Sequence, residues 1–237
     1  MANFPFQRLQ VDLAALISRS PAGQRLPSEP DLAKQLGVSR ATLREAMRSF
    51  ETQGLIRRRQ GSGTFVVGKT QVMDSGLEVL QSLETIAKRL GLEVSVSDLS
   101  IEATVADEEL AKMLDVPVGE NLTLVRRVVH ADDRPVAYLV DILPETIMRS
   151  KDLPADFNGS VLDFLLGRGD ALKTSRANVT AIGATAEVAK ALEIQRGDVL
   201  LHFHSQLFDD HGKVVDYSLS YFIPGYFHFH VVRRVGG

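Results

Sequence analysis

The sequence predicts an α+β protein of two domains, a small helical head and a larger C-terminal domain built on an antiparallel sheet. Three observations lead to this prediction. Residues 26–67 read as two short helices and a hairpin, residues 106–138 nearly repeat at 184–217, and charge is unevenly distributed. Residues 1–70 hold 11 Lys and Arg against 5 Asp and Glu, whereas the remainder holds 16 against 25. A basic head on an acidic body is typical of a DNA-binding domain joined to one that does not bind DNA.

The composition is that of an ordinary globular protein. The chain has 237 residues, of which 44% are hydrophobic and 24% charged, enough for two domains with their own cores. It contains no cysteine, which excludes disulfides and thiolate metal sites and fits a reducing cytoplasm. The N-terminal residues do not form a basic segment followed by an apolar run, so we expect no signal peptide. The sequence also lacks a run of 18 apolar residues, so we expect no membrane span.

Two helices are expected at the start of the head. The first should run from about Pro5 to Ser20, where leucine and isoleucine recur on one face. A second should begin after Ser28, which forms a capping box with Asp31. Gly37 suits the left-handed position that ends this helix.

A third helix is expected from Ser39, its cap, to about Gln53, because Gly54 can end it. Two helices separated by a short Gly-containing turn are the signature of a helix-turn-helix. Arg40, Arg44 and Arg48 form a stripe beside the apolar face of this third helix. A solvated arginine face on an ordinary helix is the alternative that this stripe alone leaves open.

The hairpin that follows decides between the two interpretations. Residues 55–57 and 64–67 read as two strands, and residues 58–63 as a basic, glycine-containing tip. Glycine lets a backbone approach a sugar-phosphate surface, and cations such as Arg58 supply attraction that is independent of DNA sequence. A helix-turn-helix followed by such a hairpin is a winged helix-turn-helix, so the head is expected to bind DNA.

The segment LPSEPDLAKQLGVSRATLREAMRSFETQGLIRRRQGSGTFV at residues 26–66 resembles the N-terminal domain of GntR-type bacterial transcription regulators. Their usual pattern is LPSERELA, then a V-S-R-x-T-v-R segment, then G-x-GTFV. The resemblance implies contacts with bases and phosphates for Ser39, Arg40, Thr42, Arg44, Gln60 and Gly61. Pro30 stands where the family has an arginine, so one phosphate contact of the motif is expected to be missing.

The predicted domains are residues 1–68, a linker at 69–76 and a C-terminal domain at 77–237. The C-terminal domain should open with a helix at 82–90 and a strand at 93–105. Each copy of the repeat then reads as a short helix, a turn, a long strand, another turn and a returning strand. A helix at about 160–166 and a strand at about 172–181 lie between the copies. These elements predict an antiparallel sheet with helices on one side.

Residues 77–230 resemble the UTRA domain that follows the winged helix in the HutC-type branch of the GntR family. The matching pieces are Ser82 nine residues before Gly91, SVLDFL at 160–165, the two copies of the repeat, and VVDYSLSYF at 214–222. The resemblance implies a chorismate-lyase-like fold, a homodimer, and a pocket for a small effector that changes DNA affinity.

The resemblance also implies the residues that bind the effector, which are Ser82, Arg127, Ser160 and, on the far wall, Asp216 and Tyr221. Ser82 opens a helix whose free N–H groups favour an anion, and Arg127 stands in an R-x-R pair of the family. A plain helix cap and a structural arginine are alternatives that the residues leave open. Val129 replaces the second arginine and Leu162 replaces a tyrosine, so we expect a small organic, anionic effector that is partly apolar.

Two histidine pairs, His202 with His204 and His228 with His230, alternate along strands and could ligate zinc. Neither pair has a carboxylate or cysteine at a known metal-site spacing, so we expect no metal and no cofactor. The sequence therefore predicts a cytoplasmic, homodimeric transcription repressor that binds a palindromic operator and responds to an effector. A constitutive DNA-binding protein and a lyase-like enzyme are the alternatives, although no nucleophile elbow, phosphate loop or H-E-x-x-H is present.

Overall fold

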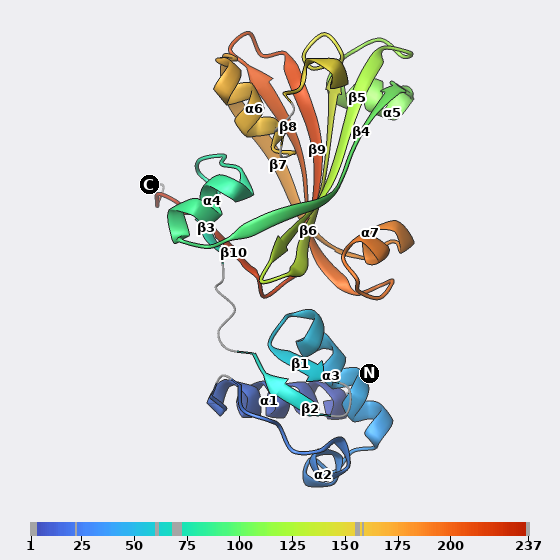
Figure 1. The fold of residues 1–237 in the computed structure, drawn as a ribbon, viewed down its shortest axis with the longest axis vertical. Helices are drawn as coiled ribbons and strands as arrows, with labels where there is room; N and C mark the ends of the chain where they lie inside the picture. Colours follow the sequence, from blue (N-terminus) through green and yellow to red (C-terminus); the bar gives the residue numbers. More distant parts are fainter. Residues whose placement is uncertain are drawn as a thin grey trace. The chain divides into compact units, whose positions relative to one another are not determined.

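A computed structural model describes residues 4–21, 23–59, 62–67, 73–154, 157 and 159–235. The chain divides into two compact units, Met1–Val72 with Pro224–His228, and Met73–Ile223 with Phe229–Gly237 (Figure 1). Among the described residues, no helix has both the length and the apolar character needed to cross a membrane.

The head contains three helices and a two-stranded hairpin. They are α1 (Phe4–Arg19), α2 (Glu29–Gln35), α3 (Arg40–Thr52), β1 (Ile56–Arg59) and β2 (Gly63–Val66). Leu13, Leu32 and Leu43, one from each helix, are completely buried against one another in a single core. The predicted helices and their order are confirmed. The prediction was possible because apolar residues at helical spacing face a common core.

Local caps set the limits of α2 and α3. The Ser28 hydroxyl accepts the Asp31 N–H at the start of α2. Gly37 has φ +66°, a left-handed conformation that side chains with a Cβ rarely adopt. The Ser39 hydroxyl then accepts the Thr42 N–H at 3.1 Å and begins α3.

The hairpin is the predicted wing, with Ile56 paired to Val66 and Arg59 paired to Gly63. Arg58 lies within strand β1 opposite Thr64, not at the tip as expected. Gln60 and Gly61, the expected tip contacts, lie outside the described residues.

The second unit is built on one six-stranded antiparallel sheet, in the order β4-β5-β6-β9-β8-β7. Its strands are β4 (Val94–Val105), β5 (Asn121–Ala131), β6 (Arg134–Pro144), β7 (Leu172–Gly183), β8 (Val199–Asp209) and β9 (Val214–Phe222). Its helices are α4 (Leu83–Leu90), α5 (Glu108–Leu114), η1 (Ser150–Asp152), α6 (Val161–Arg168) and α7 (Ala186–Ala191). The mixed antiparallel architecture predicted for this domain is confirmed.

The internal repeat is longer than the sequence indicated. The series α4-β4-α5-β5-β6 recurs as α6-β7-α7-β8-β9, and Leu172 of β7 lies 78 residues after Val94 of β4. Gly91 and Gly169 end the equivalent helices α4 and α6 in the same left-handed conformation. Strands β6 and β9 pair at the centre of the sheet, so the two copies lie on either side of that pairing.

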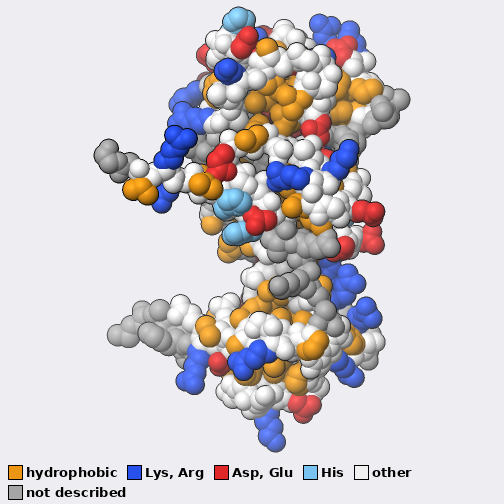
Figure 2. All heavy atoms as spheres, turned by 90° about the vertical axis from the view of Figure 1, so that its left-hand side faces the viewer, with side chains coloured by type: hydrophobic (Ala, Val, Ile, Leu, Met, Phe, Trp, Pro, Cys, Tyr) orange, Lys and Arg blue, Asp and Glu red, His pale blue; other side chains and the backbone are white. Residues whose placement is uncertain are grey.

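Helices cover both faces of this sheet, and the expectation of helices on one side was wrong. On one face, Tyr138 donates a hydrogen bond to Glu187 of α7 at 2.9 Å, and Gln206 donates to the Met113 carbonyl of α5 at 2.6 Å. On the other, α6 buries Leu165 against the sheet. The strands carry apolar residues on both faces of the sheet, so helices must pack on each face to bury them. Figure 2, viewed from the side of α4 and α6, shows apolar side chains at the surface of this unit.

Residues 73–76, predicted to belong to the linker, form strand β3 (Met73–Gly76) instead. This strand forms a two-stranded sheet with β10 (Phe227–His230). Met73 and Ser75 are buried while Asp74 is exposed, which is the alternation of a half-buried strand. Residues 68–72, the rest of the expected linker, are outside the described part of the chain.

Candidate DNA interface and ligand cavity

Helix α3 presents the predicted recognition residues at its start. Arg40 and Arg44 are exposed, one turn apart on the helix surface. Ser39 and Thr42 lie beside them, and their hydroxyl oxygens are 2.8 Å apart. In a helix-turn-helix this part of the second helix enters the major groove, where arginine can bridge two acceptors of guanine.

Glu29, the first residue of α2, connects the recognition helix with the wing. Its carboxylate lies 2.8 Å from Arg44 Nε and 3.8 Å from Arg58 Nη1. Arg58 Nε also lies 3.5 Å from the carboxylate of Glu51 on α3. The backbone N–H of Arg58 donates a hydrogen bond to the same carboxylate at 3.1 Å. The structure therefore makes Arg58 part of an ion-pair network inside the head, whereas the sequence suggested a cation free to meet phosphate.

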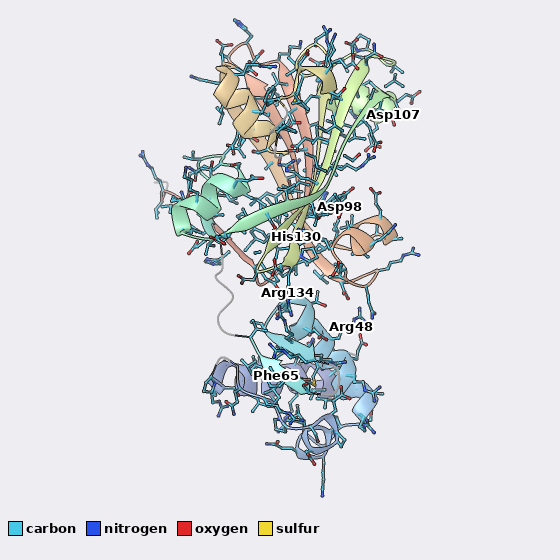
Figure 3. The ribbon with its side chains drawn as sticks, in the orientation of Figure 1. Arg48, Phe65, Asp98, Asp107, His130 and Arg134 are labelled. Carbon is cyan, nitrogen blue, oxygen red and sulfur yellow. The ribbon has the colours of Figure 1, made fainter. Side chains whose placement is uncertain are left out.

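Two further cations lie on the outside of the wing, namely Arg59, which belongs to the basic stretch expected at residues 58–63, and Arg25, which sequence reasoning missed. Arg59 is exposed, with its guanidinium 5.4 Å from the centre of the Phe65 ring. Arg25 pairs with Phe65 as an isolated bridge and packs against Gly63, where an added Cβ would come within 2.6 Å of Arg25 Nε. Figure 3 labels Phe65 on β2 and Arg48 on α3. The run of three arginines was a signal for Arg59, but nothing local indicates that Arg25 reaches the hairpin.

A cavity of about 660 Å³ lies in the C-terminal unit, between the sheet and the helices α4 and α6. Four of the five predicted ligand contacts line it, namely Ser82, Arg127, Ser160 and Asp216. Apolar side chains make up much of the rest of the wall, including Leu139, Leu162, Phe203 and Phe222. The structure thus brings residues from both copies of the repeat to one concave site, as ligand sites require.

Arg127 is buried and already paired. Only 6% of its surface is exposed, and its Nη1 donates to a carboxylate oxygen of Asp141 on the neighbouring strand β6. Its Nε has no hydrogen-bond partner among the described residues. Gly159 leaves room for this side chain, because a Cβ there would lie 2.6 Å from Arg127 Cδ.

Asp216 is buried on strand β9, with 5% of its surface exposed. Its Oδ1 finds no hydrogen-bond partner in the part of the chain that the structure describes. Burial and the nearby Asp141 carboxylate raise the pKa of Asp216 well above its ordinary value, although Arg127 opposes this shift. A buried carboxyl of this kind is a frequent feature of binding sites.

The two serines occupy equivalent positions at the starts of α4 and α6. The Ser82 hydroxyl accepts the Thr85 N–H at 3.0 Å and donates to Asp163 Oδ2 at 2.6 Å. The Ser160 hydroxyl accepts the Asp163 N–H at 3.3 Å. Both serines are therefore helix caps, and the carboxylate of Asp163 lies where an effector anion was expected at the start of α4.

Tyr221 does not line this cavity, which corrects the prediction. It lies on the opposite face of the sheet, stacked on His202 at a ring distance of 4.6 Å and near Tyr138 at 5.9 Å. Asp216 and Tyr221 are five residues apart on one strand, and side chains an odd number apart point to opposite faces. The spacing was visible in the sequence and should have separated the two.

Two acidic residues near the cavity were missed. Asp141 interrupts the apolar strand at residues 136–143, which was an available signal. Glu84 lies in the first turn of α4, and burial raises its pKa despite the opposing effect of Arg127. The sequence gives no indication that Glu84 turns inward.

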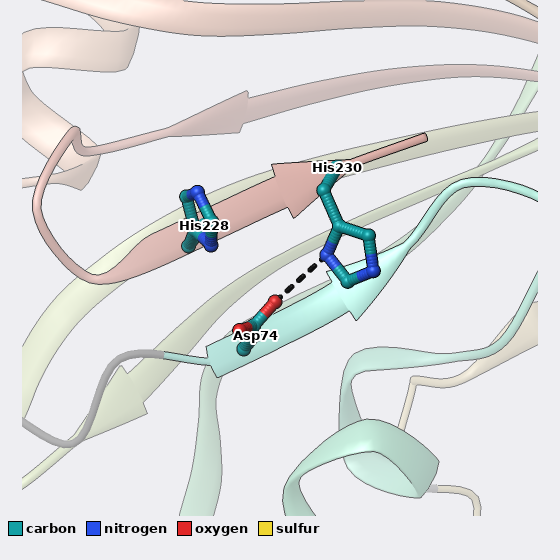
Figure 4. A group of neighbouring side chains, drawn as sticks. All are labelled: Asp74, His228 and His230. Atoms are coloured by element: carbon teal, nitrogen blue, oxygen red, sulfur yellow. Dashed lines mark hydrogen bonds and ion pairs between the residues drawn. The ribbon is translucent and has the colours of Figure 1, made fainter. Parts of the chain in front are cut away.

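His228 and His230 do have a carboxylate beside them, contrary to the sequence-based argument. Asp74 of β3 lies 2.9 Å from His230 Nδ1 (Figure 4), and ligand atoms of all three residues lie within 4.8 Å of one another. All three side chains are exposed. The other pair, His202 and His204, packs ring against ring with Tyr221 and Tyr217. The absence of a bound metal remains a prediction for both pairs.

Family models match both units. The model described as bacterial regulatory proteins, gntR family, matches residues 7–66, and the UTRA domain model matches residues 89–228. The first range contains the helix-turn-helix and the wing, and the second contains the sheet and most of the cavity wall.

Similar proteins span most of this chain. The HTH-type transcriptional repressor NagR of Bacillus subtilis is 28% identical, covering 82% of this chain and 79% of NagR. The histidine utilization repressor of Pseudomonas putida is 29% identical, covering 76% of this chain and 72% of that protein. The crystal structure of PhnF from Mycobacterium smegmatis has the same fold, with a TM-score of 0.66 and 23% identity, over 96% of this chain and 100% of PhnF.

A first prediction separates base reading from phosphate attraction. Arg44→Ala should weaken binding to a DNA site selected in vitro by about 1–3 kcal/mol, the value of one bidentate base contact. Arg59→Ala should weaken all DNA sequences alike and lower the slope of log affinity against log salt by about 0.9. Gel-shift titrations at several salt concentrations measure both, with exposed Arg176→Ala of β7 as control. Full affinity in Arg44→Ala would show that the start of α3 does not read the bases.

A second prediction concerns stability against pH. A carboxyl whose pKa is about 3.9 when unfolded and higher when folded loses stability as pH rises between the two values, by about 1.4 kcal/mol per unit. Asp216→Asn removes this loss, so the variant should gain stability relative to the native protein from pH 5 to pH 8. Urea unfolding at each pH measures the difference, with exposed Glu108→Gln as control. Parallel curves for Asp216→Asn and the native protein would refute the raised pKa.

Proposed function

Because the chain belongs to the GntR family of bacterial regulatory proteins and carries a UTRA domain, we propose that it is a repressor whose operator affinity changes when a small molecule binds in the cavity. The protein is a DNA-binding transcription regulator, not an enzyme, as its relatives are named repressors and regulators. The observation that supports effector binding most directly is the cavity of about 660 Å³ in the UTRA unit, a size suited to a small organic molecule.

We infer that the DNA-binding contacts come from Ser39, Arg40, Thr42 and Arg44 of the recognition helix, together with Gln60 and Gly61, which follow β1 in the sequence. Arg25 and Arg59 add cations on the outside of the wing, while Arg58 holds the wing against α3 through Glu51. One winged helix contacts few bases, so two-fold pairing on a palindromic operator is the economical arrangement. The protein is accordingly proposed to act as a homodimer, in the cytoplasm where the bacterial chromosome lies.

Effector control requires that the ligand bind the DNA-competent and DNA-incompetent states with different affinities. The cavity contacts α4 and α6 at their capped starts and the sheet at its centre, so a bound ligand can alter how both helices pack. Typical coupling energies of about 1–3 kcal/mol correspond to changes of about 5- to 150-fold in operator affinity.

The predicted assembly is tested by light scattering on the full-length chain. The expected mass is twice the 26.0 kDa of one chain at micromolar concentration. Binding to DNA carrying one half-site should be much weaker than binding to a palindrome, because only the palindrome engages both heads. A monomeric mass together with equal affinity for both DNAs would contradict the proposed dimer.

Effector control is tested with a metabolite library. A ligand that binds only the folded protein raises its melting temperature, and such a hit should also weaken operator binding about 5- to 150-fold. Ser218→Phe fills the cavity from β9 and should abolish both effects while leaving operator affinity without ligand unchanged. Ser95→Phe, exposed on β4, is the matched control. A hit that still releases the operator from Ser218→Phe would place the effector elsewhere.

A further inference from the structure

The inner wall of the cavity has an excess of acidic groups. We name as the acidic cluster the carboxyl groups of Glu84, Asp141, Asp163 and Asp216 together with the single guanidinium of Arg127. Asp141, Asp216 and Arg127 line the cavity directly, and the other two lie at the starts of α4 and α6 behind it. Four carboxyl groups therefore share one guanidinium in a largely buried region, while the exposed Lys173 and Glu78 add one charge of each sign to the cavity lining.

Both features that could bind an anion already contact a carboxylate of the protein, although Arg127 Nε has no hydrogen-bond partner among the described residues. Arg127 donates to Asp141, and the Ser82 hydroxyl at the start of α4 donates to Asp163 at 2.6 Å. An anionic ligand at either feature would lie close to these carboxylates in a partly buried region, where repulsion between like charges is strong. The structure therefore does not support the anionic effector that the sequence suggested.

Asp216 has the opposite requirement. It lines the cavity, is almost completely buried, and leaves Oδ1 without a hydrogen-bond partner among the described residues. A buried polar atom without a partner is destabilising, and a ligand donor that reaches it recovers much of the lost hydrogen-bond energy. Burial and the Asp141 carboxylate raise the pKa of Asp216 even though Arg127 opposes this shift, and a second cation that donates to Oδ1 would oppose it further.

We propose that the effector carries a protonated basic nitrogen that pairs with Asp216, joined to an apolar body that lies against Leu139 and Phe222. The proposal rests on the proposed effector function of this cavity and specifies the chemical class of its ligand. Charge-assisted hydrogen bonds between a cation and a carboxylate are roughly twice as strong as neutral ones. The apolar wall provides area for the remainder of the ligand, because most of the lining outside the acidic cluster is aliphatic or aromatic.

The test uses three probes that share one apolar body, namely cyclohexylmethylamine, cyclohexylmethanol and cyclohexanecarboxylate. Each is titrated at millimolar concentration into the full-length, untagged protein, and affinity is measured by NMR and by melting temperature. We expect the amine to bind at least tenfold more tightly than the alcohol and the carboxylate to bind weakest. A carboxylate that binds as well as the amine would overturn the proposal, and this ranking needs no variant.

Variants then identify the partner of the amine. Asp216→Asn should remove the preference for the amine, Asp216→Glu should retain it within a few-fold, and Glu108→Gln on exposed α5 should leave it unchanged. An unchanged preference in Asp216→Asn would overturn the assignment. Failure here is distinct from failure of the proposed function. Release of the operator by a neutral or anionic metabolite would keep the function and refute the ligand class, whereas no response to any library compound would refute the function.

Discussion

Strands β6 and β9 pair antiparallel at the centre of the sheet, with Ala137 opposite Phe222 and Asp141 opposite Ser218. The pairing joins the two copies of the repeat, and it also decides which side chains share a face. Because side chains alternate along a strand, a shift of one residue would move Asp141 from the cavity face to the face covered by α5 and α7. The same register places Asp216 on the face that carries Asp141. The set of side chains that line the cavity therefore depends on this register.

The ion pair of Arg127 with Asp141 offsets part of the electrostatic repulsion within the acidic cluster. A buried cation without its partner, or buried carboxylates without the cation, would be strongly destabilising. The pKa values of Glu84 and Asp216 are both raised, first by burial, so these carboxyl groups keep their protons to a higher pH than exposed ones do. A ligand charge placed beside them would shift these pKa values again.

The sequence predicted those features that local chemistry determines. Helix caps such as Ser39 and Gly37 act over a few residues, so the helix-turn-helix and its limits could be recognised directly. The pairing of β3 with β10 and the inward position of Glu84 depend on contacts between distant segments, for which the chain carries no local signal. Tyr221 was misplaced for a different reason, because the family resemblance was followed where strand alternation already separated it from Asp216. Arg58 was expected at the tip of the wing because the first strand was predicted to end at residue 57, whereas β1 continues to Arg59.

The repeat has a symmetric backbone and an asymmetric interior. In the register of the two hairpins, Arg127 opposes Leu139 in one copy while Ser205 opposes Ser218 in the other. Each charged member of the acidic cluster has an uncharged counterpart in the other copy. For Glu84, Arg127, Asp141, Asp163 and Asp216, the counterparts are Leu162, Ser205, Ser220, Thr85 and Ala137. A ligand in this cavity therefore meets different chemistry at its two ends, although the two halves of the fold are alike. An asymmetric molecule should therefore prefer one orientation in this cavity, and it shifts the protein toward one state by as much as its affinities for the two states differ.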